Sequence, residues 1–166
     1  MTRSSKKSEL ERKVAILVDY ANIAIQASAE KKILDFEKLL EECLQLGTVE
    51  DAFVFIPDDW YEIPQINKLG FEIITCQGVK LDSEKLEDRV DIHIIRRAWK
   101  LLSNSNITDY VLIGHDKHML EWVKDVKFKN RKIHIFAGEK LSRMLKEVPG
   151  VDLHPLPLKE KRERTF

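Results

Sequence analysis

The sequence predicts an α/β fold, a three-layer α/β/α sandwich built on a mostly parallel sheet. Short, unbroken apolar runs recur along the chain, as expected for strands that are buried on both faces of a parallel sheet. Between these runs, apolar residues recur at helical spacing. Strands that alternate with helices imply right-handed βαβ units, whose helices cover both faces of the sheet.

Five segments are predicted to be strands, because each is a short apolar run bounded by polar or turn-forming residues. They are residues 14–18, 52–56, 71–75, 110–113 and 132–136, with 153–158 as a candidate for a last edge segment. The order expected for a doubly wound sheet of these five strands is 3-2-1-4-5. Ligands of such folds bind beyond the carboxyl ends of the strands where the winding reverses, here between the first and fourth strands.

Helices are predicted between the strands. Asp35 is suited to cap the first of them and Gly47 to end it. Pro64 limits the second, and Gly70 ends it. The five predicted helices cover residues 36–46, 60–69, about 85–102, 118–126 and 139–147.

The length of 166 residues predicts one domain with its own core. We expect a flexible tail over residues 1–13, a single domain over 14–158 and a charged tail over 159–166. No apolar run approaches the roughly twenty residues needed to span a bilayer, and the polar N-terminal residues contain no apolar secretion core. These features predict a protein that does not enter a membrane.

The charge balance and the cysteine content limit the possible functions. The chain has 28 basic and 28 acidic residues, so nucleic-acid binding would have to come from local patches or from metal ions. Its two cysteines, Cys43 and Cys76, are far apart in sequence. We therefore expect neither a disulfide framework nor a zinc site built on cysteines. We expect the protein to be cytoplasmic.

Acidic side chains lie at the predicted reversal point. Asp19 ends the first strand, with Asn22 placed to orient it, and Asp116 follows the fourth strand. Asp91 lies near the start of the long helix after the third strand, on the same side of the sheet. It is in line with the apolar stripe of that helix and not with its charged face. The stripe consists of Ile94, Ile95, Ala98 and Leu102.

Three carboxylates that meet in one crevice repel each other, but they become favourable ligands when a divalent cation lies among them. Mg²⁺ or Mn²⁺ prefers oxygen ligands and suits phosphodiester hydrolysis, because the ion activates water and offsets phosphate charge. Each acid also has a structural interpretation: Asp19 and Asp116 as caps or turn formers, and Asp91 as a partner of the helix dipole. The convergence of all three favours a metal site.

Other site chemistries lack their motifs. There is no GxGxxG after the first strand and no GxxxxGK[ST], so no nucleotide cofactor is expected. There is also no G-x-S-x-G for a hydrolase triad and no HExxH for a zinc protease. His115 and His118 are close in sequence, but a zinc site would need further ligands.

Four segments together resemble a known family. They are VAILVDYANI (14–23), DIHIIRRAWKLL (91–102), DYVLIGHDKHMLEWV (109–123) and KIHIFA (132–137). The chain resembles the NYN domain, a family of PIN-like nucleases with a three-layer parallel fold. The resemblance implies a metal-dependent endoribonuclease that binds RNA and uses Mg²⁺ or Mn²⁺. Asp19, Asp91 and Asp116 match the metal-binding acids of the family, and Asn22 matches the companion of the first acid.

The chain departs from the family pattern at two acidic positions. His118 replaces the second Asp of the usual S-G-D-x-D-F motif, and Gly114 and His115 stand where Ser and Gly usually occur. Arg97 stands where the family often has a further Asp. Fewer acids imply weaker metal affinity, a preference for Mn²⁺, or RNA binding without cleavage. A catalytically weakened RNA-binding or regulatory module is therefore the alternative function, and a partner-controlled toxin-like ribonuclease is a third.

Residues around the acids are candidate RNA contacts. Lys80, Lys85 and Arg89 border the predicted site and could bind phosphates. Tyr20 could stack on a base, or it could be a packing residue at the end of the strand. His118 and Arg97 complete the candidate RNA contacts. The sequence does not determine the RNA target. It is compatible with a homo-oligomer as well as with a monomer.

Overall fold

The computed structural model describes residues 11–58, 66–76, 86–103, 106–114, 117–138, 141 and 143–161, without the side chains of 86–89. Its centre is a six-stranded sheet in the order β4-β3-β1-β5-β6-β7, in which every neighbouring pair is parallel. The predicted order of five strands is confirmed, and β7 adds a sixth at the edge. The bounds are β1 Lys13–Asp19, β3 Thr48–Pro57, β4 Glu72–Cys76, β5 Asp109–Ile113, β6 Lys132–Ala137 and β7 Asp152–Pro155.

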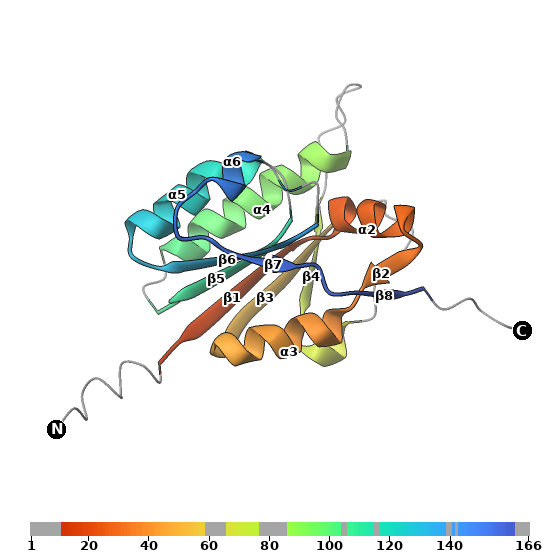
Figure 1. Ribbon diagram of the computed structural model, residues 1–166, viewed down its shortest axis with the longest axis horizontal. Helices are drawn as coiled ribbons and strands as arrows, with labels where there is room; N and C mark the ends of the chain where they lie inside the picture. The colour runs from red at the N-terminus through yellow and green to blue at the C-terminus, as the bar shows by residue number, and fades with distance from the viewer. Residues whose placement is uncertain are drawn as a thin grey trace, which may run out of the picture.

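Helices cover both faces of this sheet, which confirms the three-layer α/β sandwich. Figure 1 shows α4 (Leu86–Leu102), α5 (Leu120–Phe128) and α6 (Arg143–Lys146) on one side and α3 (Phe36–Leu46) on the other. The helix α2 (Tyr20–Ala29) begins at the carboxyl end of β1. Two short 3₁₀ turns, η1 (Asn67–Leu69) and η2 (Lys117–Met119), complete the described helical segments.

Alternation along the strands divides the core into two apolar clusters, one on each face of the sheet. Ala15 and Leu17 of β1 contact the α4–α5 side, whereas Val14, Ile16 and Val18 contact the α3 side. The predicted apolar stripe of α4 is largely confirmed, because Ile94, Ala98 and Leu102 are buried and Ile95 is partly buried. Asp91 is buried in line with them. No described helix is long and apolar enough to cross a membrane.

Three elements were not predicted. The segment of α2 is rich in Ala and Ile on several sides and has no charged face, so its helical period is weak. β2 (Lys32–Leu34) pairs antiparallel with β8 (Leu158–Glu160) from the far end of the chain. A three-residue strand whose partner lies more than a hundred positions away leaves no local signal.

Two predicted helices differ from the observed ones. Of the helix predicted over 60–69, the described part is only η1, and residues 59–65 lie outside the described residues. Near the predicted helix over 139–147, the described helix is the four-residue α6. Gly47 does end α3, but in an extended conformation. It must be small because a Cβ there would lie 2.4 Å from the backbone oxygen of Arg12.

The fold takes in residues that the sequence assigned to the tails. Lys13 begins β1, and Lys159 and Glu160 belong to β8. Arg12 forms an ion pair with the buried carboxylate of Asp109, the first residue of β5. The tail boundaries were therefore placed too far inward at both ends.

Asp109 is the centre of a buried polar network at the amino ends of β5 and β6. Its carboxylate is 1% exposed and accepts hydrogen bonds from Arg12, from the Thr108 hydroxyl at 2.8 Å and from His134 Nε2 at 2.9 Å. His134 Nδ1 lies 3.3 Å from Nε2 of His154 on β7. The network therefore links Arg12, the residue before β1, with β5, β6 and β7 through side chains.

This network sets the protonation of Asp109. Burial alone would raise the pKa of its carboxyl group, but hydrogen bonds from His134, Arg12 and Thr108 outweigh burial and hold the pKa well below its usual range. The folded chain therefore binds a proton at Asp109 less readily than the unfolded chain does. The resulting stabilisation is complete above about pH 4 and is lost as the pH falls below that value.

We predict that Asp109→Asn lowers the free energy of unfolding by about 3 kcal/mol at pH 7, because it leaves Arg12 and His134 without their anionic partner. Urea denaturation measures the change, and the difference from wild type should shrink as the pH is lowered below 4. Asp152→Asn is the control, since Asp152 is an exposed partner of the same His134, with its carboxylate 3.5 Å from Nδ1. Equal losses in the two variants would contradict the prediction.

Candidate functional site

Asp19 is the last residue of β1, and its side chain is buried at the carboxyl end of the sheet. Its Oδ2 accepts a hydrogen bond of 2.9 Å from Nδ2 of Asn22, one turn into α2. Asp19 occupies the N-cap position of α2, yet within this fully described helix its side chain makes no capping hydrogen bond. The Asp19 side chain therefore does not cap α2. The expected contact between Asp19 and Asn22 is present.

Parallel pairing places Asp19 beside the end of β5. Val18 is in register with Ile113, and a Cβ built on Gly114 would lie 3.5 Å from Cβ of Asp19, an ordinary contact distance. The chain therefore leaves β5 in direct contact with the first acid. Asp116, the third predicted acid, follows two residues later and lies outside the described residues, as does His115.

Asp91 lies on α4, which packs on the face of the sheet that Ala15 and Leu17 of β1 contact. It is the sixth residue of α4, which begins at Leu86, and it is only 5% exposed. A helix dipole acts mainly on the first turn, so it gives a weak account of a buried carboxylate at this position. Oδ2 of Asp91 lies 3.1 Å from Nδ1 of His118, which belongs to η2. The position that departs from the family motif therefore contacts one of the predicted acids.

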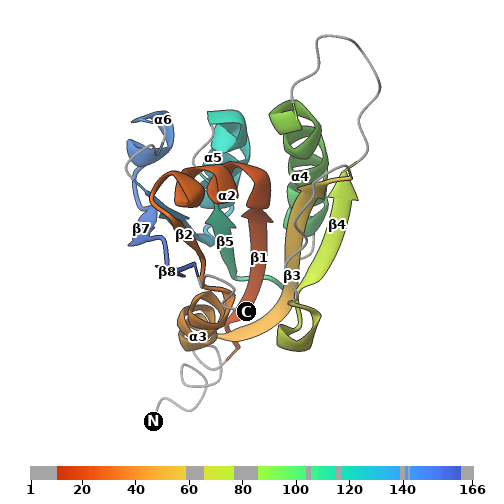
Figure 2. The ribbon, with the colours of Figure 1, turned by 90° about the vertical axis from the view of Figure 1, so that its right-hand side faces the viewer.

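The two described acids lie on elements that meet. α4 contacts β1 and α2, and η2 contacts α4. Figure 2 shows the carboxyl end of β1 and the first turns of α4 at the same end of the molecule. Among the residues that the structure describes, no three His, Cys, Asp or Glu side chains are grouped to hold a metal ion. The described donors are two buried carboxylates with an amide and an imidazole beside them, and their chemistry fits a divalent cation.

The predicted RNA contacts have different environments. The Tyr20 ring is buried and packs 5.9 Å from the ring of Phe36, which matches its interpretation as a packing residue. The guanidinium of Arg97 lies 4.9 Å from the centre of the Phe53 ring in the middle of β3. Both side chains therefore pack against the core. Lys80, Lys85 and the side chain of Arg89 lie outside the part of the chain that the structure describes.

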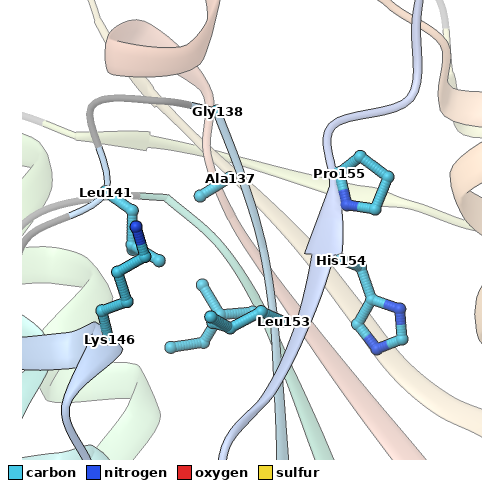
Figure 3. Close-up of a pocket in the computed structure, with 8 residues that line it drawn as sticks. Ala137, Gly138, Leu141, Lys146, Leu153, His154 and Pro155 are labelled. Carbon is cyan, nitrogen blue, oxygen red and sulfur yellow. The ribbon is translucent and has the colours of Figure 1, made fainter.

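A cavity of about 240 Å³ lies near the carboxyl ends of β6 and β7, between these strands and α6 (Figure 3). Lys146 of α6 borders one side, and Leu153 and Pro155 of β7 border the other. None of the eight lining residues is acidic, so this cavity is not a candidate for binding a metal ion through carboxylates. The remaining lining residues are Ile135, Ala137, Gly138, Leu141 and His154.

Sequence reasoning missed two features of the site. It treated the role of His118 as open, because the contact with Asp91 joins residues 27 positions apart on two different elements. It noted Gly114 only as a departure from the family motif. The close approach of Gly114 to Asp19 could have been suspected from a glycine placed directly after a buried strand beside the predicted site.

Comparison with known proteins fits this arrangement. A sequence model of the NYN domain matches residues 13–150, most of the chain. The chain belongs to the NYN domain family. The family implies a PIN-like nuclease fold, which agrees with the observed sheet and its helices. The resemblance predicted from the sequence motifs is thereby confirmed.

A solved structure shares the fold of this NYN domain. It is a protein of unknown function, VPA0982, from Vibrio parahaemolyticus RIMD 2210633, with a TM-score of 0.71 and 18% sequence identity. The match covers 87% of this chain and 94% of that one. At this identity the likeness shows the fold alone. The search of curated proteins found no match.

We predict that Asp19→Asn raises the free energy of unfolding by about 1 kcal/mol in the presence of EDTA. The substitution removes a buried charge but keeps an oxygen that can accept the hydrogen bond from Asn22. Urea denaturation beside Asp109→Asn gives the contrast, because that variant should lose stability. A loss of stability in Asp19→Asn would mean that the carboxylate of Asp19 serves the fold.

Proposed function

We propose that this NYN domain is a metal-dependent endoribonuclease that hydrolyses RNA phosphodiester bonds. The observation that carries the proposal is the pair of buried carboxylates, Asp19 and Asp91, at the carboxyl end of the sheet in a chain of this family. Folds of this kind bind their ligands at that edge. Burying carboxylates there costs stability unless a cation or another partner compensates them, which is typical of a functional site.

Each residue of the proposed site has a distinct role. Asp19 and Asp91 bind Mg²⁺ or Mn²⁺, and Asn22 orients Asp19 through its 2.9 Å hydrogen bond. Asp116 is the third ligand in this proposal. The described residues on either side of it support that role, because Gly114 borders Asp19 and His118 contacts Asp91. A bound divalent ion would supply an activated water and offset the charge on the phosphate oxygens.

The substrate class follows from the family and from the metal. The chain has no net charge, so the RNA backbone would be held mainly by the metal and by local basic residues. Lys80, Lys85 and Arg89 stay candidates for phosphate contacts because they precede Asp91 in sequence. Tyr20 and Arg97 are less suited to contact RNA, because their side chains pack against Phe36 and Phe53.

We predict that structured and unstructured RNAs are cleaved in the presence of Mn²⁺ or Mg²⁺, and that Asp19→Asn, Asp91→Asn and Asp116→Asn each slow cleavage at least about a hundredfold. Removing groups that merely orient ligands already costs up to about this factor. Denaturing gels of end-labelled RNA measure the rates. EDTA should abolish cleavage.

The matched control is Asp125→Asn, which neutralises a carboxylate of α5 that pairs with Lys129. It should cleave like wild type. Cleavage that is unchanged in all three site variants would indicate a contaminating nuclease and would overturn the proposal.

A second function is favoured by the contact between His118 and Asp91. An imidazole that occupies Asp91 competes with a cation for the same carboxylate, as expected for an RNA-binding module without cleavage. Calorimetry with Mn²⁺ separates the two functions. Metal binding that is lost in Asp19→Asn supports the nuclease, whereas RNA binding without metal binding at millimolar Mn²⁺ supports the module.

A further inference from the structure

The edge strand β7 is joined to β6 by a pair of histidines as well as by backbone pairing. His134 of β6 is buried, and its Nδ1 lies 3.3 Å from Nε2 of His154 on β7. The His154 ring stacks on Phe136 with ring centres 4.5 Å apart, on the face of the sheet that α3 covers. Figure 3 shows the His154 ring and the Leu153 side chain on opposite sides of β7. A titratable contact therefore lies in the seam between the last two strands of the sheet.

The contact between the two imidazoles depends on a single proton between them. The other nitrogen of His134, Nε2, lies 2.9 Å from a carboxylate oxygen of Asp109 and is therefore the donor in that hydrogen bond. His134 Nδ1 then accepts a proton from His154 when His134 is neutral, or donates one to His154 when His134 is charged. When both rings are charged, both facing nitrogens carry a proton. The hydrogen bond is then lost and two positive charges face each other.

We propose that this histidine pair is an acid-sensitive clasp, and that the second proton it takes up releases β7 from β6 while the rest of the sheet stays folded. β7 is suited to open alone, because it lies at the edge of the sheet and three of its four residues are exposed. The segment after it is held separately. β8 pairs with β2, and the Asp35 amide donates a 2.7 Å hydrogen bond to the Pro157 carbonyl.

The surroundings of His154 favour its neutral form. Burial lowers the pKa of His154, and the charge of His134 lowers it further. The carboxylates of Asp152 on the same strand and of Glu42 on α3 act in the opposite direction without outweighing burial. Asp152 also lies 3.5 Å from Nδ1 of His134, but its side chain is 60% exposed and its attraction is screened by solvent. Paired β7 therefore takes up the proton less readily than released β7 does.

The clasp and the network of Asp109 lose their contributions at different pH values. An unperturbed histidine has a pKa of about 6.5, so His154 stabilises paired β7 above that pH, and this stabilisation is lost as the pH falls through the lowered pKa. The hydrogen bonds of Asp109 hold its pKa well below the usual range, so that network persists until the pH is below about 4. Between these limits the edge strand is weakened while the centre of the sheet is not.

Hydrogen exchange of the full chain tests the clasp. Protection factors, which correct for the intrinsic effect of pH on exchange, are compared between about pH 7 and about pH 5 for β7 and for the central strands β1 and β5. His154→Gln keeps an N–H group for His134 but does not titrate, and His154→Phe keeps a ring for Phe136 but does not titrate. His93→Gln, on α4, is the control for the loss of a histidine elsewhere. Circular dichroism verifies that each variant is folded.

We expect the protection of β7 to fall at least about tenfold from pH 7 to pH 5 in wild type and in His93→Gln, because each pH unit below the pKa of a released histidine favours its protonated form tenfold. The protection of β1 and β5 should stay unchanged over this range. In His154→Gln and His154→Phe the fall in β7 should disappear. Either variant gives this result by itself if the other does not fold.

Three results would overturn the inference. Constant protection of β7 from pH 7 to pH 5 in wild type would show that the pair is not sensitive to acid. An equal loss in β7, β1 and β5 would indicate unfolding of the whole domain and not release of one strand. A loss in β7 that persists in the folded His154 variants would assign the effect to another titrating group.

Discussion

The parallel pairing of β1 with β3 and β5 is the constraint on which the candidate site depends. Because the three strands run in the same direction, their carboxyl ends lie at one edge, and the register that pairs Val18 with Ile113 puts Gly114 against Asp19. The helix α4, which follows β4 in the chain, begins at that end of the sheet. Asp91, its sixth residue, therefore lies at the same end of the molecule. Chemistry from segments about seventy residues apart in sequence is thereby collected in one place.

The molecule contains two kinds of buried aspartate. Asp109 lies at the opposite end of the sheet, where an arginine, a histidine and a hydroxyl hold its charge. Asp19 has a neutral amide, that of Asn22, as its described hydrogen-bond partner, and Asp91 has a half-exposed imidazole. The first carboxylate is thus held by two basic side chains and a hydroxyl, whereas the other two lie beside an amide and an imidazole at the carboxyl end of the sheet.

The departures from the family pattern differ in what they change. Arg97 covers the Phe53 ring in the middle of the sheet, so its guanidinium serves packing between α4 and β3. His118 stays at the site and contacts Asp91. Of these two departures, one therefore packs against the core, and the other contacts one of the two buried acids.

The sequence alone determined the layers, the order of the five central strands and the burial of Asp91, because apolar runs and helical stripes are local patterns that the core enforces. It also indicated the family through D-Y-x-N and the spacing of the acids. It could not determine β2 with β8, the ion pair of Arg12 with Asp109, or the contact of His118 with Asp91. These join residues that are distant in sequence, so their partners are decided only when the sheet and helices are assembled.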